Sequence, residues 1–286
     1  MFSTKAILVK LVYQHEVDAL SLLMLRMLFA LPFFVVIGLI KFRSSSSDVS
    51  RLIIKHKWTL ISLGLLGYYI ASYFDLRGLE LIDASLERMI LFLYPTVVII
   101  LSLVIYKVPI KLSQAIAIGV GYFGMYLVFV GNIQINDSGA VIHGSLLVLI
   151  STFTYSLYLV GTGGLSKKMG SVVYNSITMT VAACAIIIHN AIVHGFNLFD
   201  FTMPVYLYAL CISVMCTVVP SYLIVEGIRI IGANQSSIIG FIGPVSTIVL
   251  AVLILGEKIT FTQALGSLVI FLAVVFIIIM KQKNTT

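Results

Sequence analysis

Four charged side chains lie inside apolar stretches of this chain and are its strongest candidates for chemistry: Arg26, Asp75, Glu87 and Arg88. A charge at the centre of a membrane helix costs about 2.5–3.5 kcal/mol on insertion scales, so such residues usually face protein or a water-filled path. All four fall in the same half of their apolar runs. They predict a balanced cluster that lines a vestibule or couples to protons, with Arg26 as a structural charge. Static ion pairs at the headgroup level are the alternative.

Two prolines, Pro95 and Pro244, each lie twelve residues into an apolar run. At about 1.5 Å per residue this places each about 18 Å deep, near the middle of a bilayer. Proline frees the carbonyl four residues earlier, here that of Leu91 or Gly240. A freed carbonyl in the membrane needs a partner, which water or a solute in a cavity supplies. The pair therefore predicts a central cavity, and a simple packing kink is the alternative.

Aromatic residues near these positions are candidates for a cavity wall, although tyrosine in membrane helices is more often an interfacial anchor or a packing residue. Phe92 and Tyr94, beside Pro95, are the strongest of them. The full set is Tyr68, Tyr69, Tyr73, Phe92, Tyr94, Tyr155, Tyr158 and Phe241.

Motifs of catalysis, metal binding and nucleotide binding do not fit this sequence. The three cysteines show no CxxC or His/Cys spacing for zinc, and there is no HExxH. Gly119, Gly121 and Gly124 spell GxGxxG inside an apolar stretch, which predicts close helix packing rather than a dinucleotide site. Gly161–Lys168 is glycine-rich and basic but lacks the order of a P-loop. We expect no catalytic residue, cofactor or metal.

The composition indicates an integral membrane protein. Sixty per cent of the residues are hydrophobic and 10% are charged, whereas about a quarter are charged in soluble domains. The net charge of +7 is not gathered in a basic stripe, so it indicates orientation in a membrane rather than a nucleic-acid partner.

An internal duplication organises the chain. Residues 78–115 and 227–264 align without a gap at a shift of 149 residues. Identical residues then include a glycine, an alanine, a proline and a Gln-Ala pair, which apolar coincidence does not easily produce. Pro95 falls on Pro244 and Phe92 on Phe241. Arg77 falls on Glu226 and Glu80 on Arg229, which suggests gate-like charge pairs at opposite faces.

Nine apolar runs are long enough to cross a bilayer, which takes about 20 residues. A tenth, Met1–Tyr13, is too short. The runs are Leu20–Ile40, Trp58–Leu81, Asp83–Tyr106, Leu112–Val130, Gly144–Leu165, Val172–Val193, Pro204–Ile228, Gly232–Leu255 and Thr260–Met280, with a solvated loop expected over Lys41–Lys57.

The duplication predicts five helices per half, so the first helix should begin several residues before Met1. Either translation starts upstream, or this version has lost the first turns of that helix. A signal peptide fits poorly, because Lys5 and Lys10 interrupt the apolar stretch. We expect repeats over 1–131 and 144–283, joined by an extracytoplasmic linker over 132–143.

Alternate loops differ in their basic residues, and basic loops favour the cytoplasmic side. One set holds twelve Lys or Arg and the other three, namely Arg77, Arg88 and Lys258. Both termini are therefore predicted to be cytoplasmic in an inner membrane. Five is an odd number, so the second copy must enter from the opposite face. The predicted fold is an all-α integral membrane protein with ten helices, the first one truncated, in two inverted five-helix repeats.

The sequence resembles the drug/metabolite transporter superfamily, EamA type. The resemblance rests on ten helices in two halves, Leu25-Arg26 early in the second helix, and a proline-centred ninth helix followed by Gly256-Glu257-Lys258. The segments Asp75–Pro95 and Pro220–Glu257 are similar to a bacterial branch of that family. Tyr106-Lys107-Val108 departs from it, because the first half often has its own Gly-Glu or Lys-Glu ending.

The resemblance implies a secondary transporter, usually an exporter of amino acids, metabolites or drugs, with a cavity between the third, fourth, eighth and ninth helices. Proton coupling through Asp75, Glu87 or Glu226 is a hypothesis. A non-transporting degenerate paralogue, and less favourably an intramembrane lipid-modifying enzyme, remain alternatives. The substrate-binding positions that the resemblance implies are Asp75, Glu87, Arg88, Tyr94, Pro95, Ser221, Glu226, Ser237, Gly243 and Pro244. The aromatic pattern adds Phe92 and Phe241 to the candidate set.

Overall fold

The computed structural model describes residues 2–129, 139–195, 201–246 and 261–283, and every regular element in these ranges is helical. The elements are α1 (Phe2–Tyr13), α2 (Ala19–Arg43), α3 (Ser47–Lys55), α4 (Lys57–Gly64), η1 (Leu65–Ile70), α5 (Ala71–Leu81), α6 (Ala84–Leu91), α7 (Tyr94–Tyr106), α8 (Leu112–Phe129), α9 (Gly139–Met169), α10 (Ser171–His194), α11 (Met203–Ser213), η2 (Val214–Val218), α12 (Val219–Ile231), α13 (Ala233–Ile239) and α15 (Phe261–Lys283).

Six helical stretches of the described chain are long and apolar enough to cross a membrane, and two shorter apolar helices, Leu112–Val128 and Phe261–Phe276, accompany them. Large apolar side chains such as Ile40, Leu112 and Ile192 are more than half exposed, as expected for a surface that faces lipid. The six stretches are Ala19–Arg43, Lys57–Leu81, Leu86–Tyr106, Gly139–Met169, Ser171–His194 and Met203–Ile231.

Two expectations for connecting segments need correction. The loop expected over Lys41–Lys57 contains α3, whose Val49, Leu52 and Ile53 pack against the core. The linker expected over 132–143 ends earlier, because α9 already begins at Gly139. Residues 132–138 of that linker lie outside the described residues, as does the latter part of the run expected to end at Leu255.

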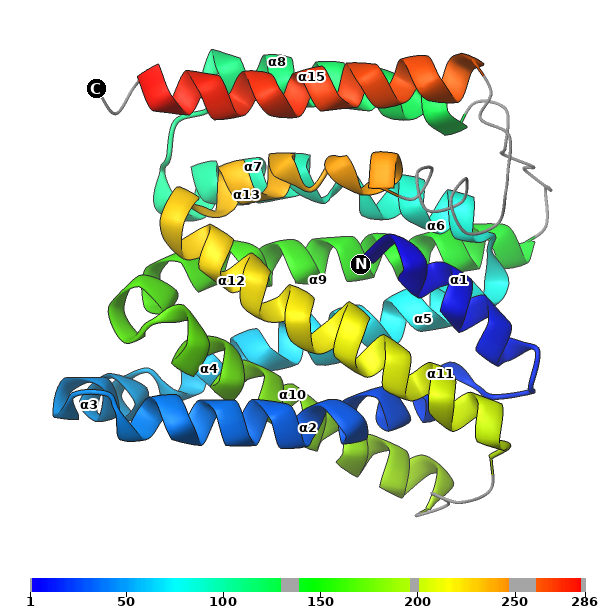
Figure 1. The fold of residues 1–286 in the computed structure, drawn as a ribbon, viewed down its shortest axis with the longest axis vertical. Helices are drawn as coiled ribbons and strands as arrows, with labels where there is room; N and C mark the ends of the chain where they lie inside the picture. The colour runs from blue at the N-terminus through cyan, green and yellow to red at the C-terminus, as the bar shows by residue number, and fades with distance from the viewer. Residues whose placement is uncertain (1, 130–138, 196–200, 247–260, 284–286) are drawn as a thin grey trace.

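Counterpart helices of the two halves run in opposite directions (Figure 1). The chain passes from α6 to α7 toward one end of the molecule, whereas α13 begins at that end and leads away from it. The same reversal relates α4–α5 to α11–α12, α2 to α10, and α8 to α15. We call the end that carries α3 and the α7–α8, α9–α10 and α12–α13 connections the basic end.

Two long helices contain a π-helical segment at the same position of the repeat. η1 begins at Leu65 and η2 at Val214, which differ by 214 − 65 = 149, the shift of the duplication. π-helical turns widen a helix and often occur at functional sites. Each therefore alters the side-chain register midway along its span.

Close backbone contact holds the outermost helix pair together. Of the three glycines predicted to serve close packing, Gly124 makes this contact, Gly121 lies against the Phe241 ring, and a Cβ on Gly119 would meet no atom within 4 Å. α8 packs along α15, and a Cβ on Gly124 would lie 2.9 Å from the carbonyl oxygen of Gly266. A Cβ on Gly266 would in turn lie 2.6 Å from the carbonyl oxygen of Gly124. Small residues let membrane helices approach this closely, so Gly124 and Gly266 are explained by packing.

Candidate functional site

A cavity of about 540 Å³ lies between the two halves of the chain. This volume is within the range of about 300–1,000 Å³ typical of small-molecule sites. Its walls come from α2, η1, α5, α6 and α7 of the first half, and from α9, η2, α12 and α13 of the second half. Most of the lining is apolar, so the few polar groups that reach the cavity decide what it holds.

Opposite charges face this cavity from neighbouring helices. Arg26 on α2 and Asp75 on α5 are only 4% and 3% exposed, and their charges act on each other. The guanidinium Nη2 of Arg26 donates to Ser72 Oγ at 3.1 Å. Arg88 on α6 also lines the cavity. Three of the four predicted charges thus meet at one hollow, and Arg26 faces it rather than serving the scaffold alone.

Glu87 occupies a different position. It is fully buried, and its Oε2 lies 3.3 Å from Nε of Arg88, but it is not among the residues that line the cavity. Its carboxylate therefore does not face the cavity, and it offsets the positive charge of the Arg88 guanidinium.

Aromatic side chains form one wall. Tyr68, Phe92, Tyr94 and Tyr155 line the cavity, and Tyr155 makes edge contacts with Tyr68 and Tyr94 at centroid distances of 6.4 and 6.0 Å. Such contacts hold the rings in fixed orientations. The other aromatic candidates, Tyr69, Tyr73, Tyr158 and Phe241, do not line the cavity.

Equivalent residues of the two copies meet where the halves cross. The rings of Phe92 and Phe241 stack at a centroid distance of 6.2 Å, with 16° between their planes. Phe241 itself is fully buried behind the wall. Nearby, the hydroxyl of Tyr94 donates to the carbonyl of Ser237 at 3.0 Å. Ser237 and Gly243 line the cavity from the second copy.

Both proline-bearing segments are interrupted just before the proline. α6 ends at Leu91 and α7 begins at Tyr94, while α13 ends at Ile239 and the helix resumes at residue 242. Pro95 and Pro244 are buried and do not line the cavity. The carbonyl of Gly240 accepts a hydrogen bond from Gly243 N at 3.0 Å. The sequence predicted water or a solute as the partner of this carbonyl, and the backbone supplies a partner instead.

The two remaining predicted residues lie away from the cavity lining. Ser221 is buried on α12, where its hydroxyl donates to Val218 O and accepts from Asn175 Nδ2, both at 2.9 Å. Glu226 pairs with Arg229 on the same helix and accepts from the hydroxyl of Ser171, which opens α10. Both residues tie α12 to α10.

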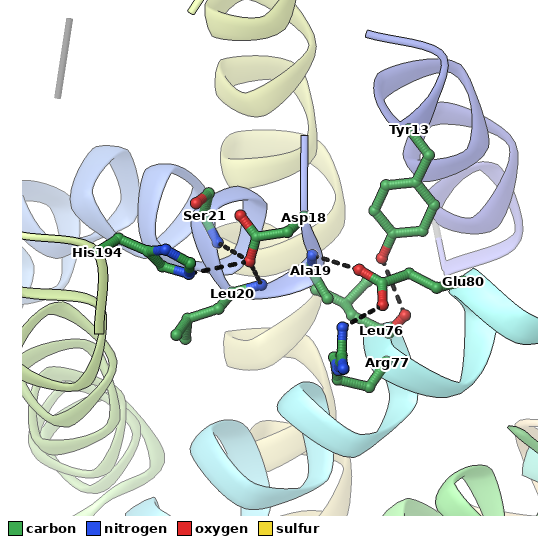
Figure 2. A network of polar contacts seen from close by, with 9 residues as sticks. All are labelled: Tyr13, Asp18, Ala19, Leu20, Ser21, Leu76, Arg77, Glu80 and His194. Atoms are coloured by element: carbon green, nitrogen blue, oxygen red, sulfur yellow. Dashed lines mark hydrogen bonds and ion pairs between the residues drawn. The ribbon is translucent and has the colours of Figure 1, made fainter. Parts of the chain in front are cut away.

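The counterpart pair, Arg77 with Glu80, lies on α5 (Figure 2). This helix ends at the side of the molecule opposite the α12–α13 connection (Figure 1). Arg77 Nη1 and Glu80 Oε2 are 2.6 Å apart, and Glu80 Oε1 accepts from the backbone N of Ala19, the first residue of α2. Figure 2 also shows Asp18 capping α2 and 3.4 Å from His194 at the end of α10. Each copy thus joins its third and second helices through a carboxylate.

Hydroxyl side chains on the cavity wall were missed by the sequence analysis. Ser151 and Thr152 line the cavity from α9 beside the predicted Tyr155 and beside Leu159, and spacings of three and four residues place these side chains on one helix face. That periodicity was the available signal. The other lining serines and threonines that the sequence did not single out are Ser72, Thr217, Ser236 and Ser246.

This arrangement is suited to binding a solute. Opposite charges, hydroxyls and aromatic faces can hold an amphipathic solute. Within the described ranges no group of three or more His, Cys, Asp or Glu side chains could hold a metal ion.

Comparison with known proteins gives three findings. The EamA-like transporter family model matches residues 1–130 and 142–279. The Uncharacterized transporter YcbK of Bacillus subtilis (strain 168) is 29% identical over 270 residues, which cover 93% of this chain and 85% of that protein. A protein of known crystal structure has a TM-score of 0.76 at 13% identity, covering 100% of this chain and 98% of that one. The last finding concerns the fold alone. Because the family model covers nearly the whole sequence, the chain belongs to the EamA-like transporter family.

Proposed function

We propose that this membrane transporter is a secondary transporter that moves a small solute by alternating access, with the 540 Å³ cavity as its binding site. The observation that carries the proposal is a cavity lined by both halves of the chain, whose counterpart helices run in opposite directions. In transporters built this way, one repeat rocks against the other around a site at their interface.

The proposed architecture is ten helices in two inverted repeats, the first helix being short. Two further observations support it. The π-helical segments η1 and η2 occupy the same repeat position, and Phe92 stacks on its own counterpart Phe241. A contact between equivalent residues is expected close to the axis that relates two copies.

The solute that fits this cavity is a small metabolite, amino acid or drug with an apolar body and a charged group. The tyrosines and Phe92 would pack on its body, while Arg26 and Asp75 offer charges of both signs. Asp75 is the proposed proton-coupling residue, because Glu226 pairs with Arg229 and Glu87 lies outside the cavity lining.

The proposed location is the cytoplasmic (inner) membrane, with the basic end and both termini in the cytoplasm and net flux outward. Lys107 and Lys111 lie at the basic end in the α7–α8 connection, and Lys167 and Lys168 lie there in the last turn of α9. Such residues favour the cytoplasmic side.

The test compares metabolites in cells and medium for strains that carry the wild-type chain, the Asp75→Asn variant or an empty vector. We expect one or a few compounds to move outward with the wild type only. Proteoliposomes loaded with those compounds should then release them, and a protonophore should abolish the release.

Equal metabolite profiles in the three strains, together with inactive proteoliposomes, would leave the non-transporting paralogue as the better account. Appearance of a chemically altered lipid with the wild type alone would instead favour the enzyme.

A further inference from the structure

A second hollow, of about 410 Å³, lies at the basic end between α4, α7 and α9. It shares no lining residue with the central cavity. Its inner walls are Leu63 of α4 and Leu66 of η1, with Leu157 and Val160 of α9. We call it the basic-end groove. Nothing in the proposed transport cycle uses it.

The groove has a polar mouth and an apolar interior. His56, Thr59, Tyr106 and Lys168 line it at the ends of their helices. From these ends the lining extends inward to Leu66, nine residues beyond Lys57, which is about 14 Å at 1.5 Å per residue. A molecule that fills the groove must therefore have a polar end and a long apolar part.

Side chains around the mouth mark the headgroup level of the bilayer. Trp58 is 72% exposed, and the Lys57 ammonium lies 5.6 Å from the centre of its ring. Tyr106 is also exposed. Exposed tryptophan and tyrosine concentrate at the membrane–water interface, where lysine ammonium groups also reach the headgroups. The mouth of the groove thus opens at the depth of lipid phosphates.

The glycine-rich stretch Gly161–Lys168 explains why the groove exists. Gly161 lies against Leu63, and a Cβ there would meet the Leu63 side chain at 2.5 Å. Gly164 also lines the groove, but a Cβ there would meet no atom within 4 Å. The first glycine lets α9 approach α4, and the second leaves space open. Lys168 then places a positive charge at the mouth.

We propose that the basic-end groove binds an anionic phospholipid of the surrounding bilayer, with one acyl chain between α4 and α9 and the phosphate at Lys168. Charge complementarity favours this occupant. Arg51, Lys55, Lys57 and Lys167 lie in the same end of the fold and are all exposed. Basic pockets between membrane helices are suited to anionic headgroups, and the apolar walls exclude a free phosphate ion as the complete ligand.

The experiment measures lipid binding to the full chain, purified and stripped of lipid in a neutral detergent, by native mass spectrometry. Dioleoyl phosphatidylglycerol and dioleoyl phosphatidylcholine are titrated separately. The wild type should retain one phosphatidylglycerol with about tenfold higher affinity than phosphatidylcholine, which corresponds to about 1.4 kcal/mol.

Two variants separate the contribution of the lipid's acyl chain to binding from that of its headgroup. Gly164→Leu should fill the groove and abolish tight binding of both lipids, whereas Lys168→Gln should remove the preference for phosphatidylglycerol. Gly119→Leu and Lys167→Gln are the matched controls. Gly119 also has open space around it but lies on α8, and Lys167 carries the same charge next to Lys168 without lining the groove. Unchanged thermal unfolding would confirm that the variants fold.

Equal affinity for the two lipids on the wild type, or wild-type binding by Gly164→Leu, would overturn the proposal. Displacement of phosphatidylglycerol by millimolar inorganic phosphate or glycerol phosphate would also overturn it, because a free anion would then suffice. None of these readouts depends on transport, so the result stands apart from the proposed function.

Discussion

The two repeat copies share their backbone irregularities but differ in the chemistry of their side chains. η1 and η2 begin at equivalent positions, and both Pro95 and Pro244 follow a break in their helix. By contrast, Asp75 of the first copy corresponds to Ile224 of the second, although both line the cavity. The repeated features shape the hollow, and the features present in one copy give it polarity.

A second difference concerns space. The first copy has Leu91 and Tyr94 where the second has Gly240 and Gly243. A Cβ on Gly240 would lie 1.5 Å from the Tyr94 hydroxyl, and one on Gly243 would lie 2.7 Å from the Phe92 ring. The small residues of one copy thus receive the large residues of the other. The two copies have thus diverged at positions that contact each other across the interface.

The largest effect should come from removing the charge that only the first copy has. Asp75→Asn should reduce transport of the identified solute about ten- to a hundredfold, because a hydrogen bond to a charged group contributes about 1.5–3 kcal/mol. Flux from proteoliposomes measures it. Ile224→Asn, at the equivalent position, is the control and should lower flux much less. Equal losses of flux in the two variants would show that the charge of Asp75 has no particular role in transport.

The next effect tests the fit between copies. Gly240→Ala should lower the free energy of unfolding by about 1–3 kcal/mol, the usual cost of overpacking a filled core. Adding Tyr94→Phe should recover part of the loss, because the hydroxyl that the new methyl meets is gone. Thermal unfolding in detergent measures both. If the double variant is no more stable than Gly240→Ala, the contact with Tyr94 is not the cause.

A smaller effect distinguishes α2 from α10, which are the helices that follow the first connection of each half. Asp18 caps α2 by accepting from Leu20 N and Ser21 N, whereas Gly170 before α10 provides no side-chain cap. Asp18→Ala should cost about 1 kcal/mol, a typical value for a lost cap, and Asp18→Asn should cost much less. Gly170→Asp should not stabilise α10, because φ at that residue is +84° and side chains disfavour it. A stabilising Gly170→Asp would contradict this account.

The smallest effect concerns the two charge pairs. Glu80→Gln should cost at most about 1 kcal/mol, since partly exposed ion pairs contribute little. The effect of Glu226→Gln should be smaller still, because Glu226 is 37% exposed against 21% for Glu80. Unfolding at low and high salt measures both, and salt should reduce the difference. A loss of transport without a loss of stability would instead give these pairs a gating role.

Much of the fold follows from local sequence. The runs expected to begin at Leu20 and Trp58 correspond to helices that begin at Ala19 and Lys57, because apolar length alone decides whether a segment can cross a bilayer. Amphipathic α3 was missed, since serine-rich composition obscured a short periodic segment. The interruption at Phe92–Leu93 was expected only as a kink, because the proline pattern does not say how far a helix opens.

The candidate site was less accessible to sequence reasoning. Asp75, Arg88 and Tyr94 line the cavity, whereas Glu87 and Glu226 do not, although all five are polar residues in apolar surroundings. The π-helical turns of η1 and η2 set the register of Asp75 on α5 and of Glu226 on α12. For the residues of α6 and α7, the packing of these helices against the rest of the fold decides which side chains face the cavity. The hydroxyls of α9 were passed over because serine and threonine are common in membrane helices.

The sequence by itself determined that the chain enters a membrane, repeats itself with a shift of 149 residues and carries a proline that disturbs the helix at the same position of each copy. These properties depend on composition, length and the missing N–H of proline, all of which are local. Only the tertiary structure decided that Arg26 and Asp75 line the same cavity and that Phe92 stacks on Phe241. Such contacts join residues far apart in the chain, and they depend on how the helices pack, which local sequence does not determine.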